Sequence, residues 1–237
     1  MRINYVIATW NGIRIKPVKN TKYYEEVLKN HIKILNKTIN SITQITVMRP
    51  YSGIQNSYYD IDQNDKIKII DCENKYQSYG QWLKASSLFL NDFDYFIFIE
   101  DDYAPGTDNF DLKLIQIYEE GYYLCSKVFY EPRPHGSISN GILSSKTIEK
   151  ALTRSNYDIW LRDYGVRNRA IVAKGRNYQI AFSEYLTHHG ILLKDYSDTY
   201  KVDFYHGHCN TVQDYSAHTV VYNEKIFTPI QTIIECK

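Results

Sequence analysis

The sequence of 237 residues lacks several features that would assign it to a broad class at once. No stretch of about 18 consecutive apolar residues occurs, so the pattern predicts no membrane-spanning helix. A strand-like segment follows Met1 directly, so we expect no signal peptide and a cytoplasmic location. Charge of one sign is not in excess either. Lys and Arg number 28 against 27 Asp and Glu, which disfavours binding to nucleic acid or to an anionic membrane surface.

Cysteine is scarce and poorly spaced for metal binding. The four cysteines form no CxxC pair, whereas the cysteine ligands of a structural zinc ion are usually closely spaced. The pattern argues against a structural zinc site and favours ordinary thiols in a reducing compartment. These residues are Cys72, Cys125, Cys209 and Cys236.

Strand-like and helix-like segments alternate in the first half of the chain. Apolar runs predict strands over residues 3–9, 42–48, 66–71 and 94–99, and a three-to-four spacing predicts helices over 23–39 and 79–90. Thr21 is expected to cap the first helix, and Arg49-Pro50 to end the second strand. This α/β order, with strands that are apolar almost throughout, predicts a sheet covered on both faces.

The second half is less regular. We expect helices over 110–120, 146–152 and 183–189, and strands over 122–130, 138–143 and 200–205. Ser145 is expected to cap the middle helix, and Gly190 to end the last one. Residues 131–136 read as a stiff connector, and residues 156–175 show no clear period, which suits a segment that faces a substrate. With 43% hydrophobic residues and no linker, the chain is expected to form one domain over 1–237.

Three adjacent acids follow the most apolar strand. Glu100, Asp101 and Asp102 stand at its carboxyl end, where open α/β sheets bind their ligands. Crowded carboxylates repel one another unless a cation relieves them, and hard oxygen ligands suit Mg²⁺ or Mn²⁺. An isolated Asp pair would more simply open a solvated turn before Pro105, but the preceding buried strand favours a divalent-ion site.

With this motif the chain resembles nucleotide-sugar-dependent glycosyltransferases of the GT-A type and is similar in layout to glycosyltransferase family 2. The Glu-Asp-Asp form is similar to the one in type I N-acetylglucosaminyltransferases. The resemblance implies the GT-A fold, an α/β domain with a mainly parallel central sheet flanked by helices. It also implies a nucleotide-binding half over 1–105 and an acceptor-side half over 106–237.

The resemblance assigns roles to individual residues. It implies that Glu100 contacts ribose and that Asp102 binds the metal ion bridging the donor diphosphate. The segment 7–11 resembles the strand that meets the nucleotide, and 74–85 resembles the loop and helix that close over it. Arg49 is one of several basic residues suited to phosphate. The implied cofactor-binding residues are Thr9, Asn11, Arg49, Tyr79, Lys84, Glu100 and Asp101.

Glu184 and His206 complete the expected site. By resemblance Glu184 is the general base of an inverting enzyme, although Tyr185 stands where a second acid is common. A first-turn Glu favoured by the helix dipole is the alternative. His206, beside Gly207 and His208, is expected to bind the metal or the departing diphosphate, and a structural histidine is its alternative. Trp160 suits stacking on a sugar, and a basic residue within 162–176 suits an anionic ligand.

Together these residues predict transfer of a sugar from a nucleotide-diphosphate donor, with a UDP-sugar preferred, to a glycan or other hydroxyl acceptor. The transfer is expected to depend on Mn²⁺ or Mg²⁺ and to invert the anomeric centre. Two alternatives stay open. A sugar-nucleotide-forming nucleotidyltransferase should have a Gly-rich basic loop, of which 10–14 is a poor version, and a non-catalytic glycan- or nucleotide-binding module would not need the three acids.

Overall fold

The computed structural model describes residues 1–9, 21–51, 61, 63–73, 75–101, 103–131, 133–136, 140–168, 177–196, 204–206, 221–222 and 225–226. Its helices are α1 (Thr21–Lys37), α2 (Gln77–Phe89), α3 (Phe110–Ile117), α4 (Ser145–Leu152), α5 (Tyr157–Asn168) and α6 (Asn177–His188). Its strands are β1 (Ile3–Ala8), β2 (Gln44–Tyr51), β3 (Ile67–Glu73), β4 (Tyr95–Glu100), β5 (Tyr103–Pro105), β6 (Tyr122–Cys125), β7 (Val128–Phe129), β8 (His135–Gly136), β9 (Asn140–Ser144), β10 (Leu192–Asp195), β11 (Phe204–His206), β12 (Val221–Tyr222) and β13 (Lys225–Ile226).

A seven-stranded sheet of order β10-β6-β9-β4-β1-β2-β3 forms the centre of the structure. β3, β2, β1 and β4 are mutually parallel, and β10 is parallel to β6. β9 lies antiparallel between β4 and β6, so it is the one strand of this sheet that runs against the others. The expected α/β fold with a mainly parallel central sheet is confirmed.

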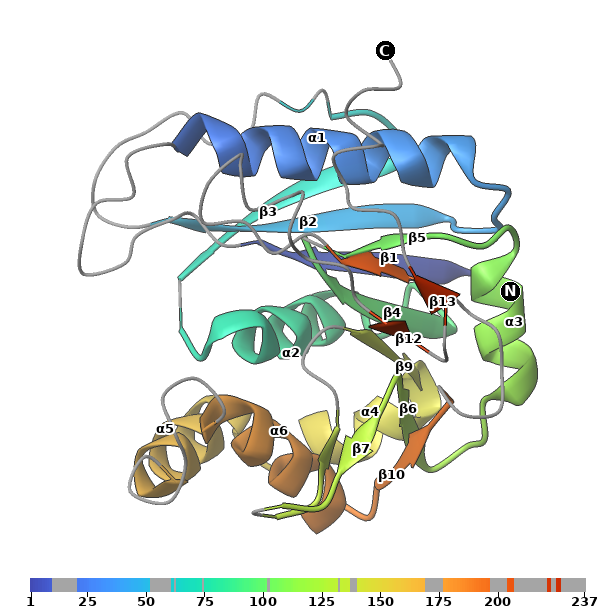
Figure 1. Ribbon diagram of the computed structural model, residues 1–237. Coiled ribbons are helices and arrows are strands. Elements are labelled where there is room, and N and C mark those ends of the chain that lie inside the picture. The colour runs from blue at the N-terminus through green and yellow to red at the C-terminus, as the bar shows by residue number, and fades with distance from the viewer. Residues whose placement is uncertain are drawn as a thin grey trace.

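Both faces of the sheet are covered by helices (Figure 1). On β1, Tyr5 and Ile7 pack with residues of α1 and α3, whereas Val6 and Ala8 pack with residues of α2 and α6. Strand side chains alternate between the two faces, so a strand buried on both sides is apolar at nearly every position. The buried exception in β1, Asn4, accepts a hydrogen bond from Thr46 of β2. This is why the strand pattern was readable in the sequence.

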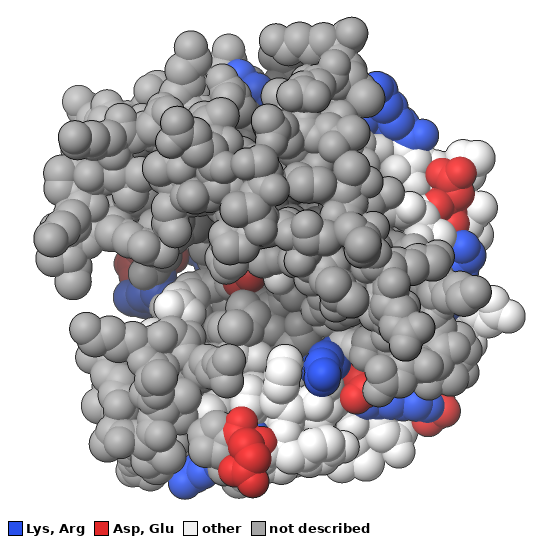
Figure 2. Space-filling view, viewed as in Figure 1, with Lys and Arg blue, Asp and Glu red and all other residues white. Residues whose placement is uncertain are grey.

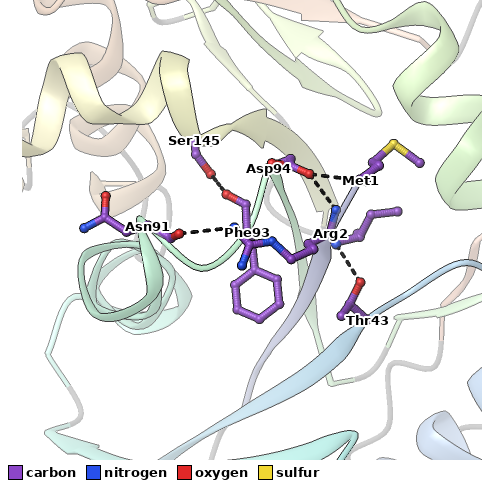
Figure 3. A network of polar contacts seen from close by, with 8 residues as sticks. Met1, Arg2, Thr43, Asn91, Phe93, Asp94 and Ser145 are labelled. Carbon is purple, nitrogen blue, oxygen red and sulfur yellow. Dashed lines mark hydrogen bonds and ion pairs between the residues drawn. The ribbon is translucent and has the colours of Figure 1, made fainter.

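The amino ends of β1, β2 and β4 are tied together on the side opposite the acids (Figure 3). The Asp94 carboxylate accepts a hydrogen bond of 2.6 Å from the backbone N–H of Arg2. Thr43 Oγ1 accepts one of 3.0 Å from the backbone N–H of Ile3, and Ser145 Oγ donates to the carbonyl oxygen of Phe93. These contacts fix the start of the parallel strands and of α4.

Several sequence-based boundaries were wrong. β2 continues through Arg49-Pro50 to Tyr51 by its pairing with β3, whereas its pairing with β1 ends at Met48 within the described residues. The Ile45 N–H points toward β3, so by alternation the position of Pro50 faces the β1 side, where its missing N–H breaks no described pairing. Ser144, not Ser145, caps α4, and its hydroxyl accepts from the Thr147 N–H. The segment 138–143 is correspondingly the strand 140–144, with 137–139 outside the described residues.

The acceptor-side half contains more helix than the pattern predicted. Residues 157–168 form α5, where exposed Ile159 and buried Leu161 place apolar side chains on different faces. α6 begins at Asn177, and the sequence pattern placed its start near Ser183. The early part of the helix was missed because its buried side chains lie on several faces and form no single apolar stripe. The predicted strand 122–130 is divided into β6 and β7, and the connector after it contains β8.

The structure describes two of the four cysteines and part of the charged surface. Cys72 and Cys125 are buried and form no disulfide within the described ranges, and burial raises the pKa of Cys72 to about 11, whereas Cys209 and Cys236 lie outside the described residues. None of the helices in the described ranges is long and apolar enough to cross a membrane. Among the described side chains visible in Figure 2, basic and acidic groups are interspersed and do not gather into a patch of one sign.

Gly141 of β9 lets the Tyr123 ring lie directly on the sheet. A Cβ atom at Gly141 would lie 2.3 Å from both Cε2 and the hydroxyl oxygen of Tyr123. We expect Gly141→Ala to lower the free energy of unfolding by about 1–3 kcal/mol, since the buried ring cannot move without disturbing the core. Denaturant unfolding measures this. The double variant Gly141→Ala with Tyr123→Leu should lose less unfolding free energy than the sum of the losses in the two single variants. A loss equal to that sum would contradict the clash.

Candidate active site

The acidic segment stands at the carboxyl edge of the parallel strands. Glu100 is the last residue of β4 and lies in register with Ala8 of β1. The next residue, Asp101, is buried, and its backbone N–H donates to the Ala8 carbonyl oxygen at 3.0 Å. The ladder between β1 and β4 therefore extends one residue beyond the strand. It fixes the backbone that leads into Asp102.

The first turn of α2 lies against these acids. Ser78 Oγ donates a hydrogen bond to Glu100 Oε1. Tyr76 and Gln77, just before it, have φ angles of 60° and 56° in the left-handed region, which non-glycine residues rarely adopt. Gly80 allows the turn to close, since a Cβ there would lie 2.3 Å from the Lys75 carbonyl oxygen. This strained turn brings Ser78 to the carboxylate.

Gln81 of α2 holds the residue that follows β1. Its side chain accepts from the Thr9 N–H at 3.0 Å and donates to the Thr9 carbonyl oxygen at 2.9 Å. The Thr9 hydroxyl donates to the carbonyl oxygen of Met48 at 2.8 Å. Thr9 is buried, so its backbone and hydroxyl link α2, β1 and β2 at the edge where the acids lie.

The Tyr79 side chain is packed in the apolar core. It is fully buried against Trp82 and Phe182, with ring centroids 5.2 and 5.1 Å away. Burial, and then the charge of Glu100, raise the pKa of Tyr79 well above its usual value. Burial, and then Cys125 and Glu100, raise the pKa of Tyr123 in turn. Their two hydroxyl oxygens are buried and make no hydrogen bond within the described part of the chain.

Arg49 and Lys84 stand at the β3 side of the same edge. Arg49 forms a two-point ion pair with Asp71, with Nε–Oδ1 at 2.6 Å and Nη2–Oδ2 at 3.0 Å. This hydrogen bonding raises the pKa of Arg49 and lowers the pKa of Asp71. Lys84 is half-buried on α2, and its charge opposes the rise in the pKa of Cys72 on β3.

Glu184 lies in the middle of α6, because the helix begins at Asn177. The alternative explanation of Glu184 as a first-turn residue stabilised by the helix dipole is therefore wrong. Glu184 Oε1 accepts a hydrogen bond from Arg133 Nη1 at 2.6 Å, and 21% of its side chain is exposed. The neighbouring Ser183 accepts from the Gly136 N–H at 3.0 Å, so β8 and, through Arg133, the loop before it are attached to this stretch of α6.

The remaining expected ligands are described only in part. Asn11 and Asp102 lie outside the described residues, and of His206 only the backbone is described. β11 pairs antiparallel with β5, and His206 lies opposite Tyr103, the residue after Asp102. Within the side chains that are described, no three His, Cys, Asp or Glu residues form a group able to bind a metal ion.

The segment expected to face a substrate contains aromatic and ionic packing. Trp160 lies 4.6 Å from His188 and 5.9 Å from Tyr185, measured between ring centroids, and packs against the core. Arg162 forms an ion pair with Asp163 at 2.9 Å. Residues 169–176, which include the other basic candidates Arg169, Lys174 and Arg176, lie outside the described ranges.

A comparison with solved structures found a similar fold in a crystal structure of the glycosyltransferase GlyE from Streptococcus pneumoniae TIGR4, with a TM-score of 0.51 and 12% identical residues. The chain shares the fold of a glycosyltransferase. The match covers 84% of this chain and 46% of that one, so the chain spans about half the length of the solved structure. The apo form of GlyE matches 81% of this chain and 44% of that one at 14% identity, with a TM-score of 0.44. No sequence-family model and no curated protein matches the chain, so the likeness to family 2 stays a prediction.

Sequence reasoning missed three residues that hold the site together: His31, Ser78 and Gln81. His31 lies within the predicted helix 23–39, and Ser78 and Gln81 lie within the predicted loop and helix 74–85. Their partners were not readable, because Gln81 and Thr9 are 72 positions apart and His31 and Asp101 are 70 apart. No local pattern encodes such contacts.

Gln81→Leu tests the link between α2 and Thr9. The substitution keeps the approximate volume but leaves the buried Thr9 N–H and carbonyl without their partner, so we expect a loss of about 2 kcal/mol in the free energy of unfolding. Denaturant unfolding gives the value. Ser87→Ala, an exposed change on the same helix, is the control and should cost far less. Equal stability of Gln81→Leu and wild type would show that the contact contributes nothing.

Proposed function

We propose that this chain is a glycosyltransferase that moves a sugar from a nucleotide-diphosphate donor to a hydroxyl acceptor. The observation that carries the proposal is the acidic segment at the carboxyl end of β4, held by β1 and α2 in the fold of a glycosyltransferase. Ligands of open α/β sheets bind at this edge. A UDP-sugar is the donor that the resemblance favours.

In this proposal the donor lies over Glu100 and Asp102. Glu100 accepts from a ribose hydroxyl with the orientation that Ser78 gives its carboxylate. Asp102 and His206 would hold Mn²⁺ or Mg²⁺, and the register of β11 on β5 supports this pairing because it places His206 opposite the neighbour of Asp102. Carboxylate ligands suit both of these ions. When bound, the ion would neutralise charge that develops on the diphosphate leaving group.

We assign proton acceptance from the acceptor hydroxyl to Glu184 and infer that the reaction inverts the anomeric centre. A carboxylate can accept this proton as the hydroxyl oxygen attacks the anomeric carbon. Arg133 donates to Oε1 of Glu184, and a carboxylate that accepts one hydrogen bond keeps further lone pairs at which it can accept a proton. The hydrogen bond between Ser183 of α6 and Gly136 of β8 would hold Glu184 on the acceptor side.

Asp102→Asn should abolish metal-dependent donor binding. A thermal-shift panel of nucleotide sugars with and without Mn²⁺ first identifies the donor, because a ligand that binds the native state raises the melting temperature. Calorimetry with that donor should then detect no Mn²⁺-dependent affinity in Asp102→Asn. Glu100→Gln is the matched control. It keeps an acceptor oxygen for Ser78 and for ribose, and should weaken binding less. Wild-type affinity in Asp102→Asn would remove this residue from the site.

Glu184→Gln tests the base. The amide keeps an oxygen for Arg133 but cannot accept a proton, so turnover should fall roughly 10²- to 10⁴-fold with donor affinity little changed. Glu149→Gln, on the exposed part of α4, is the control and should retain full turnover. NMR coupling constants of the fresh product should report the anomeric configuration opposite to the donor's. Retained configuration, or normal turnover in Glu184→Gln, would contradict an inverting reaction assisted by Glu184.

A further inference from the structure

Two buried hydrogen bonds of His31 connect α1 to the acidic segment and to β1, on the face of the sheet opposite α2. His31 Nδ1 lies 3.0 Å from the carbonyl oxygen of Asp101, and His31 Nε2 lies 2.9 Å from the hydroxyl of Tyr5. His31 and Tyr5 are 2% and 0% exposed, and their rings meet edge to face at 5.7 Å. Water therefore cannot replace either hydrogen bond.

The partners fix the tautomer of His31. A carbonyl oxygen only accepts hydrogen bonds, so Nδ1 must carry the proton that it donates to Asp101. In the neutral ring Nε2 then accepts, and Tyr5 must donate its hydroxyl proton to it. Burial raises the pKa of Tyr5 well above its usual value, so this hydroxyl stays protonated and available as a donor.

The contact fixes the backbone at the point where the sheet ends. The Asp101 N–H is held by the carbonyl of Ala8 on β1, and the Asp101 carbonyl is held by His31 on α1. Both peptide planes around Asp101 are thereby attached to rigid elements. Asp102 follows directly in the sequence, and Tyr103 after it opens β5. A displaced Asp101 carbonyl would rotate the peptide that leads to Asp102.

We propose that His31 is a positioning residue that sets the geometry of the acidic segment from the face of the sheet opposite α2, and thereby sets the affinity of the site for the divalent ion and the donor. This inference rests on the proposed function for its effect on the donor, but not for its effect on the backbone of residues 100–102. It gives α1, which contributes none of the expected donor-binding residues, a defined part in the site.

Three substitutions of His31 distinguish the hydrogen bond of Nδ1 from that of Nε2. Asn carries its amide near the position of Nδ1, Gln carries its amide near the position of Nε2, and Leu carries no donor at all. We expect His31→Asn to keep the metal-dependent donor affinity within a few-fold of wild type, because it still donates to Asp101. His31→Gln and His31→Leu should weaken it by about tenfold, the effect of one buried hydrogen bond. Leu35→Ala, a core change on the same helix, is the control for lost stability alone.

Calorimetry with Mn²⁺ and the donor measures these affinities, and thermal unfolding measures stability. The proposal requires that Leu35→Ala lower the melting temperature without changing donor affinity. Equal affinity in His31→Leu and wild type would overturn it. So would a loss in Leu35→Ala as large as that in His31→Leu, since that result would mean that stability alone controls binding.

Nitrogen NMR of the wild-type protein supplies a readout that does not depend on the donor. The His31 ring should carry a proton on Nδ1, and the backbone amide signals of Asp101 and Asp102 should shift in His31→Leu more than in His31→Asn. A proton on Nε2 alone, or unmoved amide signals in His31→Leu, would overturn the proposal. A wild-type protein that binds no nucleotide sugar would instead overturn the proposed function, and the NMR result would still decide the role of His31.

Discussion

Burial of β4 on both faces is the constraint on which the site depends. Phe96 and Phe98 point into the core beneath α2, and Ile97 and Ile99 into the core beneath α1. A carboxylate at any of these four positions would lose its hydration without a partner, which costs several kcal/mol or forces it to stay protonated. The acids therefore occupy the first positions beyond the buried run. Their place at the sheet edge follows from the packing of the strand before them.

A position just outside the core does not by itself fix the conformation of the acidic segment. The hydrogen bonds that order it come from elements on both sides of the sheet, with Ser78 of α2 on the Glu100 carboxylate and His31 of α1 on the Asp101 carbonyl. Gln81 holds Thr9 in the same layer. Because each of these helices is fixed by its own apolar face, changes in helix packing are transmitted to the site through single polar contacts.

The limits of sequence reasoning follow from the range of the interactions. The strands and the acidic cluster were predicted because two-sided burial leaves a local signature that a few adjacent residues carry. α5 and the first turns of α6 were missed because their apolar residues serve different neighbours and show no common period. The Ser144 cap was misplaced by one residue, since two serines stand side by side and only the backbone decides between them. The partners of His31, Ser78 and Gln81 lie outside any sequence window.

The same core links the acidic segment to Glu184. Phe182 of α6 lies 5.1 Å from Tyr79 and 6.1 Å from Trp82, measured between ring centroids, and Tyr79 directly follows Ser78 on α2. Tyr185, on the other side of Glu184, donates its hydroxyl to the Ala151 carbonyl at 2.9 Å. Residues on both sides of Glu184 are thus fixed in one apolar cluster that also supports Ser78. The backbone positions of the proposed base and of the donor-side acids are coupled by aromatic packing, and the ion pair between Glu184 and Arg133 adds a side-chain contact to this arrangement.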